Sequence, residues 1–266
     1  MILALSSGWG LAAAAGAVAS YSVLALSASR LSPRTLRGVL FAAWLLHGLV
    51  LTTGLIAEPL RFGFAPALSM TVWLVLSIYA VESQLLPQLG THWALASLGA
   101  LAVALTVVFP GSFYHRIASP WLPLHWALGI ASYGLFAVAV VHGWLTTRTE
   151  RAMRLATSCD TGVPLLTLER LTFRFVQAGF VLLTATLLVG WLFAEQLYGL
   201  GQVWSWSHKT IFSVLAWLTF AGLLVGRARL GWRGQKAVRL LYLGSGLLLL
   251  GYVGSRFVLE VILHRL

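Results

Sequence analysis

Long apolar stretches alternate with short groups of charged residues along the whole chain. A charged side chain in the hydrocarbon core costs a few kcal/mol or more, so the gaps between charges locate the membrane-spanning segments. Eight gaps are long enough for a span, whose usual length is about 20 residues. The last two, 210–226 and 240–255, are short for a fully apolar span and are extended by residues that reach the interface. We therefore predict an all-α membrane protein that forms a single transmembrane domain over residues 1–266. Its predicted helices lie near 7–28, 37–57, 65–84, 92–109, 122–146, 173–195, 209–227 and 237–260.

The composition leaves no room for a separate soluble domain. Hydrophobic residues make up 59% of the chain and charged residues only 9%, whereas about a quarter of the residues in soluble domains are charged. The single cysteine, Cys159, excludes an internal disulfide, a paired-cysteine redox motif and covalent attachment of haem through a C-x-x-C-H motif. Any chemistry therefore depends on other side chains.

The distribution of basic residues predicts the orientation in the membrane. The formal net charge is +11, which in a soluble protein would suggest a nucleic-acid partner. In a membrane protein, Lys and Arg accumulate instead in cytoplasmic loops. Thirteen of the 18 basic residues fall on one side of the predicted topology, around the loops 29–36, 147–172 and 228–236. We therefore predict that both termini lie outside the cytoplasm, that lipid surrounds the protein, and that it has no nucleic-acid partner.

The acidic residues argue against several classes of activity. None of the seven lies in the middle of a predicted helix. Ion-coupled transporters usually carry an ionisable residue near the bilayer midplane, and glycosidases need two carboxyl groups in one pocket. The chain also lacks the short motifs of nucleotide-binding loops, serine hydrolases and zinc proteases. We predict no enzymatic activity, and a transporter is the least favoured interpretation.

The histidines remain as candidates for chemistry, and the predicted helices sort them by depth. His47 lies halfway along its helix, where an unpartnered imidazole is costly, so it has either a functional role or a role between helices. His125 lies at the outer end of a helix, and His142 lies about 25 Å further along it at 1.5 Å per residue. His208 and His264 also project to the outer face. An axial haem ligand such as His125 or His264 needs a partner from another helix.

A tryptophan-rich segment precedes the predicted helix 209–227. Trp204 and Trp206 stand just before His208 and Lys209. Interfacial tryptophans usually anchor helices at the headgroup level. Alternatively, the indoles form a flat surface for a porphyrin, whose propionates would meet Lys209 or Arg256.

Several motifs together resemble the cytochrome c assembly family. They are Leu124-His125-Trp126, Ser132-Tyr133-Gly134, Leu168-Glu169-Arg170, the stretch from Trp204 to Trp217, and Gly231-Trp232-Arg233-Gly234. Within this family the chain is similar to the CcsA- and HemX-related branch, and most of all to its short bacterial YpjD-type proteins. The resemblance implies a multi-pass protein of the bacterial inner membrane with a role in cytochrome c biogenesis.

The resemblance also implies a haem site at the outer face. In CcsA-type members a tryptophan-rich outer segment receives haem, and outer histidines flank it. By position, His125 matches the first outer histidine, and His47 is the candidate for an inner site. The residues that match the tryptophan motif are Trp204, Trp206, Lys209 and Trp217.

The chain departs from the family pattern at several of these positions. Ser207 and His208 stand where aspartate and proline are expected. Thr210 replaces a glutamate, and Val225 stands where a membrane histidine would fall. His264 lies about one position from the expected second outer histidine. A route for haem through the membrane needs ligands at both depths, and only the outer site has two candidates, so the departures argue against full haem export.

Three interpretations follow. The first is a protein that binds or passes haem b at its periplasmic face, with His125 as one axial ligand and His264 or His208 as the other. Other membrane or cytochrome assembly proteins are its expected partners. The second is a non-catalytic accessory or scaffolding subunit of a larger membrane complex, which has kept the fold and lost haem transfer. The third is an ion or small-solute transporter.

Overall fold

The computed structural model describes residues 8–27, 30–56, 60–85, 92–114, 121–155, 163–195 and 207–262. Their contacts divide the chain into two compact units. Unit 1 comprises Met1–Arg116 and Arg256–Leu266, and unit 2 comprises Ile117–Ser255. The single transmembrane domain over residues 1–266 stays a prediction.

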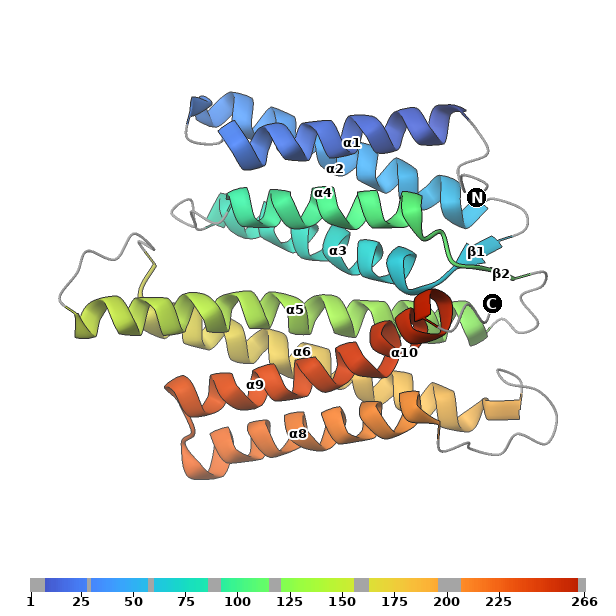
Figure 1. Cartoon of the computed structure of the whole chain (residues 1–266). Helices are drawn as coiled ribbons and strands as arrows, with labels where there is room; N and C mark the ends of the chain where they lie inside the picture. Colours follow the sequence, from blue (N-terminus) through green and yellow to red (C-terminus); the bar gives the residue numbers. More distant parts are fainter. Residues whose placement is uncertain are drawn as a thin grey trace. The chain divides into compact units, whose positions relative to one another are not determined.

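Unit 1 is built mainly from helices with small residues at their contacts. The helices are α1 (Gly8–Ser27), α2 (Pro33–Ile56), α3 (Phe64–Leu85) and α4 (His92–Val108), coloured blue to green in Figure 1. α1 packs against α2 and α4, and α3 packs against α4 and α2. Ala17 and Ala43 are fully buried. Side chains of this size let helix backbones approach closely, which is how helices associate in lipid.

Two short strands join the loops at one end of unit 1. β1 (Leu60–Phe62) pairs with β2 (Ser112–Tyr114) in antiparallel fashion. Gly111 precedes β2 with a φ of 85°, and a Cβ at this position would lie 2.5 Å from the backbone of Phe62. Only glycine fits there, because it has no Cβ and tolerates positive φ. The all-α prediction missed these strands, since three residues are too few to show an alternating pattern.

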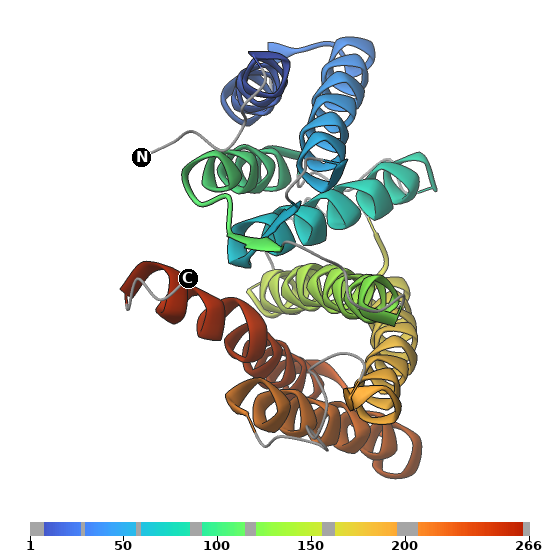
Figure 2. The same cartoon turned by 90° about the vertical axis from the view of Figure 1, so that its right-hand side faces the viewer.

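Unit 2 consists of four long helices that run back and forth (Figures 1 and 2). They are α5 (Trp121–Arg154), α6 (Leu165–Leu192), α8 (His208–Leu230) and α9 (Gly234–Leu249). α5 packs along α6 and α9, and α8 packs along α9. Phe136 and Phe220 stack in the core with ring centroids 3.8 Å apart. Gly244 makes this possible, because a Cβ there would lie 2.7 Å from the Phe220 ring.

The last helix continues beyond α9 through wide turns. The π-helical turn η2 (Leu250–Gly254) is followed by α10 (Ser255–Phe257) and a second π-helical turn, η3 (Val258–Ile262). Wide turns change the hydrogen-bond partners of the backbone carbonyls, and side chains bond to several of them here. The Ser255 hydroxyl donates to the carbonyls of Leu250 at 3.2 Å and Gly251 at 2.9 Å, and the Tyr133 hydroxyl donates to the carbonyl of Leu248.

The helices fit a protein that crosses the membrane several times. Seven of the described helices are long and apolar enough to span a bilayer, whereas the apolar part of α4, Ala94–Val108, is shorter. A helix is present at each of the eight predicted positions, so the multi-pass helical architecture is confirmed. The placement of both termini in the periplasm stays a prediction.

Two helices are longer than the gaps between charges indicated. α5 continues to Arg154 instead of ending at 146, and α6 begins at Leu165 instead of 173. Charged residues interrupt the membrane-spanning stretch but not the helix, because Glu, Arg, Ala and Met are good helix formers. The predicted loop 147–172 is therefore wrong at both of its ends.

α2 also begins earlier than predicted, at Pro33 instead of 37. The Ser32 hydroxyl accepts a hydrogen bond from the Thr35 amide at 3.2 Å, which is the usual N-cap interaction. Proline is common at the first helical position because the amide that it lacks has no partner there. The prediction began at the last arginine before the apolar stretch and so passed over this start signal.

Candidate functional site

His125 lies near the start of α5, and its ring faces α6. A Cβ on Gly190 would lie 3.2 Å from the Cε1 atom of the ring, so this glycine leaves the space that the imidazole occupies. The ring interacts with the backbone of Thr186, one turn before Gly190. Nδ1 is buried and makes no hydrogen bond within the described residues. A neutral imidazole that donates from Nε2 keeps an unshared electron pair on Nδ1, which is the group that an iron ligand needs.

An aromatic pair covers the same end of α5 and α6. The rings of Trp121 and Phe193 stack with centroids 3.9 Å apart and planes 10° apart. Trp121 stands one helical turn before His125, so both side chains lie on the same face of α5. The sequence analysis missed this pair because it looked for indoles only in the segment before α8. A tryptophan four residues before a candidate histidine was the signal that could have found it.

The start of α8 also lies at this end of unit 2 (Figure 1). The Ser207 hydroxyl accepts from the Thr210 amide at 3.4 Å and caps the helix, and His208 is exposed. The Nζ atom of Lys209 lies 5.8 Å from the centroid of the Tyr252 ring in η2. We refer to this end, with His125, His208 and Lys209, as the histidine end of unit 2.

The remaining predicted site residues are not all described. Trp204, Trp206 and His264 lie outside the described residues. Arg256 is described, but it belongs to unit 1, whereas His125 and Lys209 belong to unit 2. Its Nη1 atom lies 3.9 Å from Oε1 of Glu260, whose side chain is 5% exposed. A propionate would therefore compete with a carboxylate for Arg256.

His47, the candidate for an inner site, is part of a polar network in unit 1. Its ring is fully buried. Nε2 lies 2.8 Å from the Ser69 hydroxyl on α3, and Nδ1 lies 3.3 Å from the Tyr21 hydroxyl on α1. The two hydrogen bonds join three helices. Either nitrogen would have to give up its partner before it could bind iron.

The Tyr21→Phe variant tests this role of His47. It should lower the free energy of unfolding by about 1 kcal/mol, because Nδ1 of His47 then remains buried without a partner. Thermal unfolding of the purified protein in detergent measures the loss. We expect the absorption spectrum of haem-loaded protein to stay the same. A shifted Soret maximum in this variant would contradict a structural role and make His47 a ligand.

Two other positions bear on an inner site. His142 is 2% exposed, and its ring packs against Phe175 with centroids 5.5 Å apart, so it lies within the helix packing of unit 2. Val225 on α8 is 60% exposed. The position where the family pattern places a membrane histidine is thus on an outward face of α8.

The opposite end of unit 2 brings together two of the motifs that carried the family resemblance. Glu169 on α6 binds Arg227 on α8 with a distance of 2.5 Å between Oε1 and Nη1, and Nε of Arg233 lies 3.9 Å from the same oxygen. Arg227 also donates to the carbonyl of Trp232 at 3.3 Å. The Trp232 ring lies against Gly226, where a Cβ would come within 2.1 Å of it. These motifs therefore tie α6 to the turn between α8 and α9.

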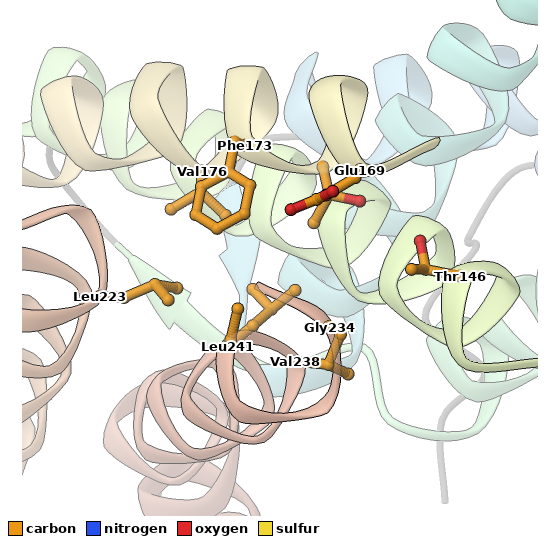
Figure 3. A pocket seen from close by; sticks show the side chains of 10 residues that line it. Thr146, Glu169, Phe173, Val176, Leu223, Gly234, Val238 and Leu241 are labelled. Carbon is orange, nitrogen blue, oxygen red and sulfur yellow. The ribbon is translucent and has the colours of Figure 1, made fainter. Parts of the chain in front are cut away.

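A small cavity lies beside this ion pair. Figure 3 shows Glu169 and Phe173 pointing from α6 toward Val238 and Leu241 of α9. Its volume is about 10 Å³, which is room for about one water molecule. A porphyrin cannot enter a space of this size, so the cavity is not a candidate haem site.

The apolar spans, with their charges concentrated at helix ends, define a multi-pass helical membrane protein. The chain belongs to the cytochrome c assembly protein family, whose model matches residues 34–263. It is therefore a membrane protein of the cytochrome c biogenesis class. Haem handling is the general kind of function of this class. The family that the sequence motifs predicted is confirmed.

Known proteins of two kinds are similar to the chain. It is 30% identical to the inner membrane protein YpjD of Escherichia coli (strain K12) over 165 residues, which are 60% of each chain. It is 25% identical to the cytochrome c biogenesis protein CcsA of Prochlorococcus marinus subsp. pastoris over 227 residues, 81% of this chain and 69% of that protein. The chain thus spans about 60% of the length of YpjD. No solved structure matches it.

Proposed function

We propose that the protein binds or passes haem at the periplasmic face of the bacterial inner membrane. The proposed form is haem b, and cytochrome assembly proteins are the proposed partners. The proposal includes no bond-making reaction. The proposed groups are His125 with His264 or His208 for the iron, Trp204 and Trp206 for the porphyrin face, and Lys209 or Arg256 for the propionates.

The observation that carries the proposal is the state of His125. Its ring is turned into unit 2, against Gly190 and the backbone of Thr186. Nδ1 is buried and has no hydrogen-bond partner among the residues that the structure describes. Leaving a buried nitrogen in this state is costly. Binding to a metal removes that cost, because the lone pair then has an acceptor. Haem supplies an iron atom that takes imidazole nitrogens as axial ligands.

Neighbouring residues fit the periphery of a porphyrin. The stacked rings of Trp121 and Phe193 place a flat aromatic surface one turn from His125, and flat rings stack favourably on one another. Lys209 brings a positive charge to the histidine end, and charge-assisted bonds to carboxylates are among the strong hydrogen bonds in proteins. Arg256 is a further candidate for a propionate, although Glu260 already lies beside it.

A second candidate function is that of an accessory or scaffolding subunit. Two observations favour it: Val225 is exposed where the family pattern has a membrane histidine, and both nitrogens of His47 already have partners. A chain without an inner site cannot hold haem in transit through the membrane. Under this function, other membrane proteins would co-purify with the chain and no pigment would.

Titration of the purified protein with haem in detergent tests the first proposal. Two imidazole ligands should give a low-spin absorption spectrum with a sharp Soret band that saturates at one haem per chain. Apomyoglobin added afterwards should remove the haem slowly. If the spectrum stays that of free haem in detergent at every ratio, haem binding is wrong and the accessory function is favoured.

A further inference from the structure

The end of unit 2 opposite the histidine end is strongly basic. It combines the last turns of α5 and α8 with the first turns of α6 and α9. Glu169 of α6 and Arg227 of α8 form an ion pair there. We call it the basic end. Nine of its Arg and Lys side chains are exposed. They are Arg148, Arg151, Arg154, Arg170, Arg174, Arg229, Arg233, Lys236 and Arg239.

The acidic residues described at this end do not balance these charges. Glu169 is bound to Arg227 at 2.5 Å. Glu150 lies against the start of α9, because a Cβ on Gly234 would be 3.0 Å from its Oε1 atom. The positive end of the helix dipole stabilises a carboxylate at this place. Glu169 is therefore already paired, and two carboxylates do not balance nine exposed cations. The exposed cations repel one another and attract an anionic partner from outside.

Exposed apolar side chains between the cations indicate that this partner is a lipid. Large apolar residues are exposed at the same helix ends: Met153 by 55%, Leu155 by 62%, Leu166 by 68% and Leu230 by 67%. A mixture of basic and apolar side chains is typical of protein surfaces at the boundary between headgroups and acyl chains. A folded acidic protein offers no acyl chains to cover the leucines.

Two pairs, each of a cation and a tryptophan ring, also indicate that the basic end lies at the level of the lipid headgroups. Arg148 lies over the Trp144 ring at 5.5 Å, and Lys236 lies over the Trp232 ring at 4.0 Å. Tryptophan is enriched at the headgroup level because its ring is apolar and its N–H is polar. The charged groups themselves, Cζ of Arg148 and Nζ of Lys236, lie over these rings, so cations and indoles share one level of the basic end.

We propose that the basic end binds the headgroups of anionic phospholipids, centred on the turn between α8 and α9. This turn is held in place before any lipid binds. Gly231 adopts a left-handed conformation with a φ of 62°, the Trp232 ring lies on Gly226, and Arg227 bonds to the Trp232 carbonyl. Arg229, Arg233 and Lys236 are exposed around it, and the proposed lipid phosphate lies among them.

Native mass spectrometry of the full chain with added lipid tests this proposal. The wild-type protein should retain phosphatidylglycerol several-fold more strongly than phosphatidylcholine. In the Arg229→Gln/Arg233→Gln/Lys236→Gln variant that preference should be lost almost entirely, since each cation near a membrane surface contributes about fivefold. Equal retention of the two lipids by the wild-type protein would overturn the proposal.

Unit 1 provides a matched control with the same loss of charge. Arg30, Arg34 and Arg37 are also exposed, and the topology predicts them on the same side of the membrane. Because the proposed site is the turn between α8 and α9, the Arg30→Gln/Arg34→Gln/Arg37→Gln variant should keep most of the preference for phosphatidylglycerol. If it loses as much as the first variant, net charge alone explains the preference and the proposed site is wrong.

Two further measurements keep the proposal falsifiable if the first variant does not fold. The Arg229→Lys/Arg233→Lys variant keeps the charge and should keep most of the preference. Inorganic phosphate and polyglutamate should displace phosphatidylglycerol from the wild-type protein only weakly. If inorganic phosphate displaces phosphatidylglycerol at a concentration similar to that of the lipid, the basic end is a site for free anions. If polyglutamate displaces it, the partner is an acidic protein.

Discussion

Replacement of His125 by alanine is expected to abolish the low-spin Soret band of the haem-loaded protein. The loss of an axial nitrogen leaves iron with at most one protein ligand, and the methyl group of alanine cannot replace it. The affinity for haem should fall by more than the ~10–100-fold that the loss of an outer-sphere partner usually costs. A haem titration followed by absorbance measures both effects.

Three variants separate ligation from packing at this position. The His125→Phe variant keeps a ring in the space beside Gly190 and should lose the band equally. The His125→Gly variant should regain it when free imidazole is added, because the small base then supplies the missing nitrogen. His208→Ala changes an exposed residue and should remove the band only if His208 is the second ligand. An unchanged spectrum in His125→Phe would exclude His125 as a ligand.

The Gly226→Ala substitution is expected to destabilise unit 2. The new Cβ would lie 2.1 Å from Cε3 of Trp232, so the indole must leave its place. The turn that contains Trp232 would shift together with the indole, and the hydrogen bond from Arg227 to the Trp232 carbonyl would be disturbed. Overpacking costs about 1–3 kcal/mol, and a contact this short belongs at the upper end of that range. The melting temperature should fall by about 5 °C or more.

The same helix offers the control for this substitution. Gly222 lies one turn before Gly226, and a Cβ there would have nothing within 4 Å. The Gly222→Ala variant should be as stable as the wild type or gain up to about 1 kcal/mol, because alanine favours the helix. Thermal unfolding in detergent gives the melting temperatures of the Gly222→Ala and Gly226→Ala variants. Similar melting temperatures for both variants would contradict the close contact between Gly226 and Trp232.

The spans were predictable from the sequence because the cost of charge in lipid is large. That cost places Arg30, Arg61 and Arg148 outside the apolar stretches, so the gaps between charges mark the crossings. It does not mark where helices end. Glu150 and Arg154 stand beyond the crossing and still continue α5, because helix propensity is a local property of the backbone and side chain.

The candidate site was predictable only in part, since spacing along a chain does not show which faces meet. The sequence identified His125 by its place in a motif, but not its contact with Gly190 on another helix. The ion pair of Glu169 and Arg227 joins residues 58 positions apart, and no local pattern indicates such a pair. The motifs pointed to Glu169 as a member of the family pattern but not to Arg227, which lies between two of them.

The π-helical turns at Leu250–Gly254 and Val258–Ile262 bear on how the C-terminal segment compares with its relatives. A turn closed by an i to i+5 hydrogen bond contains one residue more than an α-helical turn. It is how a helix absorbs a single-residue insertion without breaking. Each of the two turns can hold one inserted residue, so an alignment of this segment with its relatives should open one or two single-residue gaps between Leu250 and Ile262.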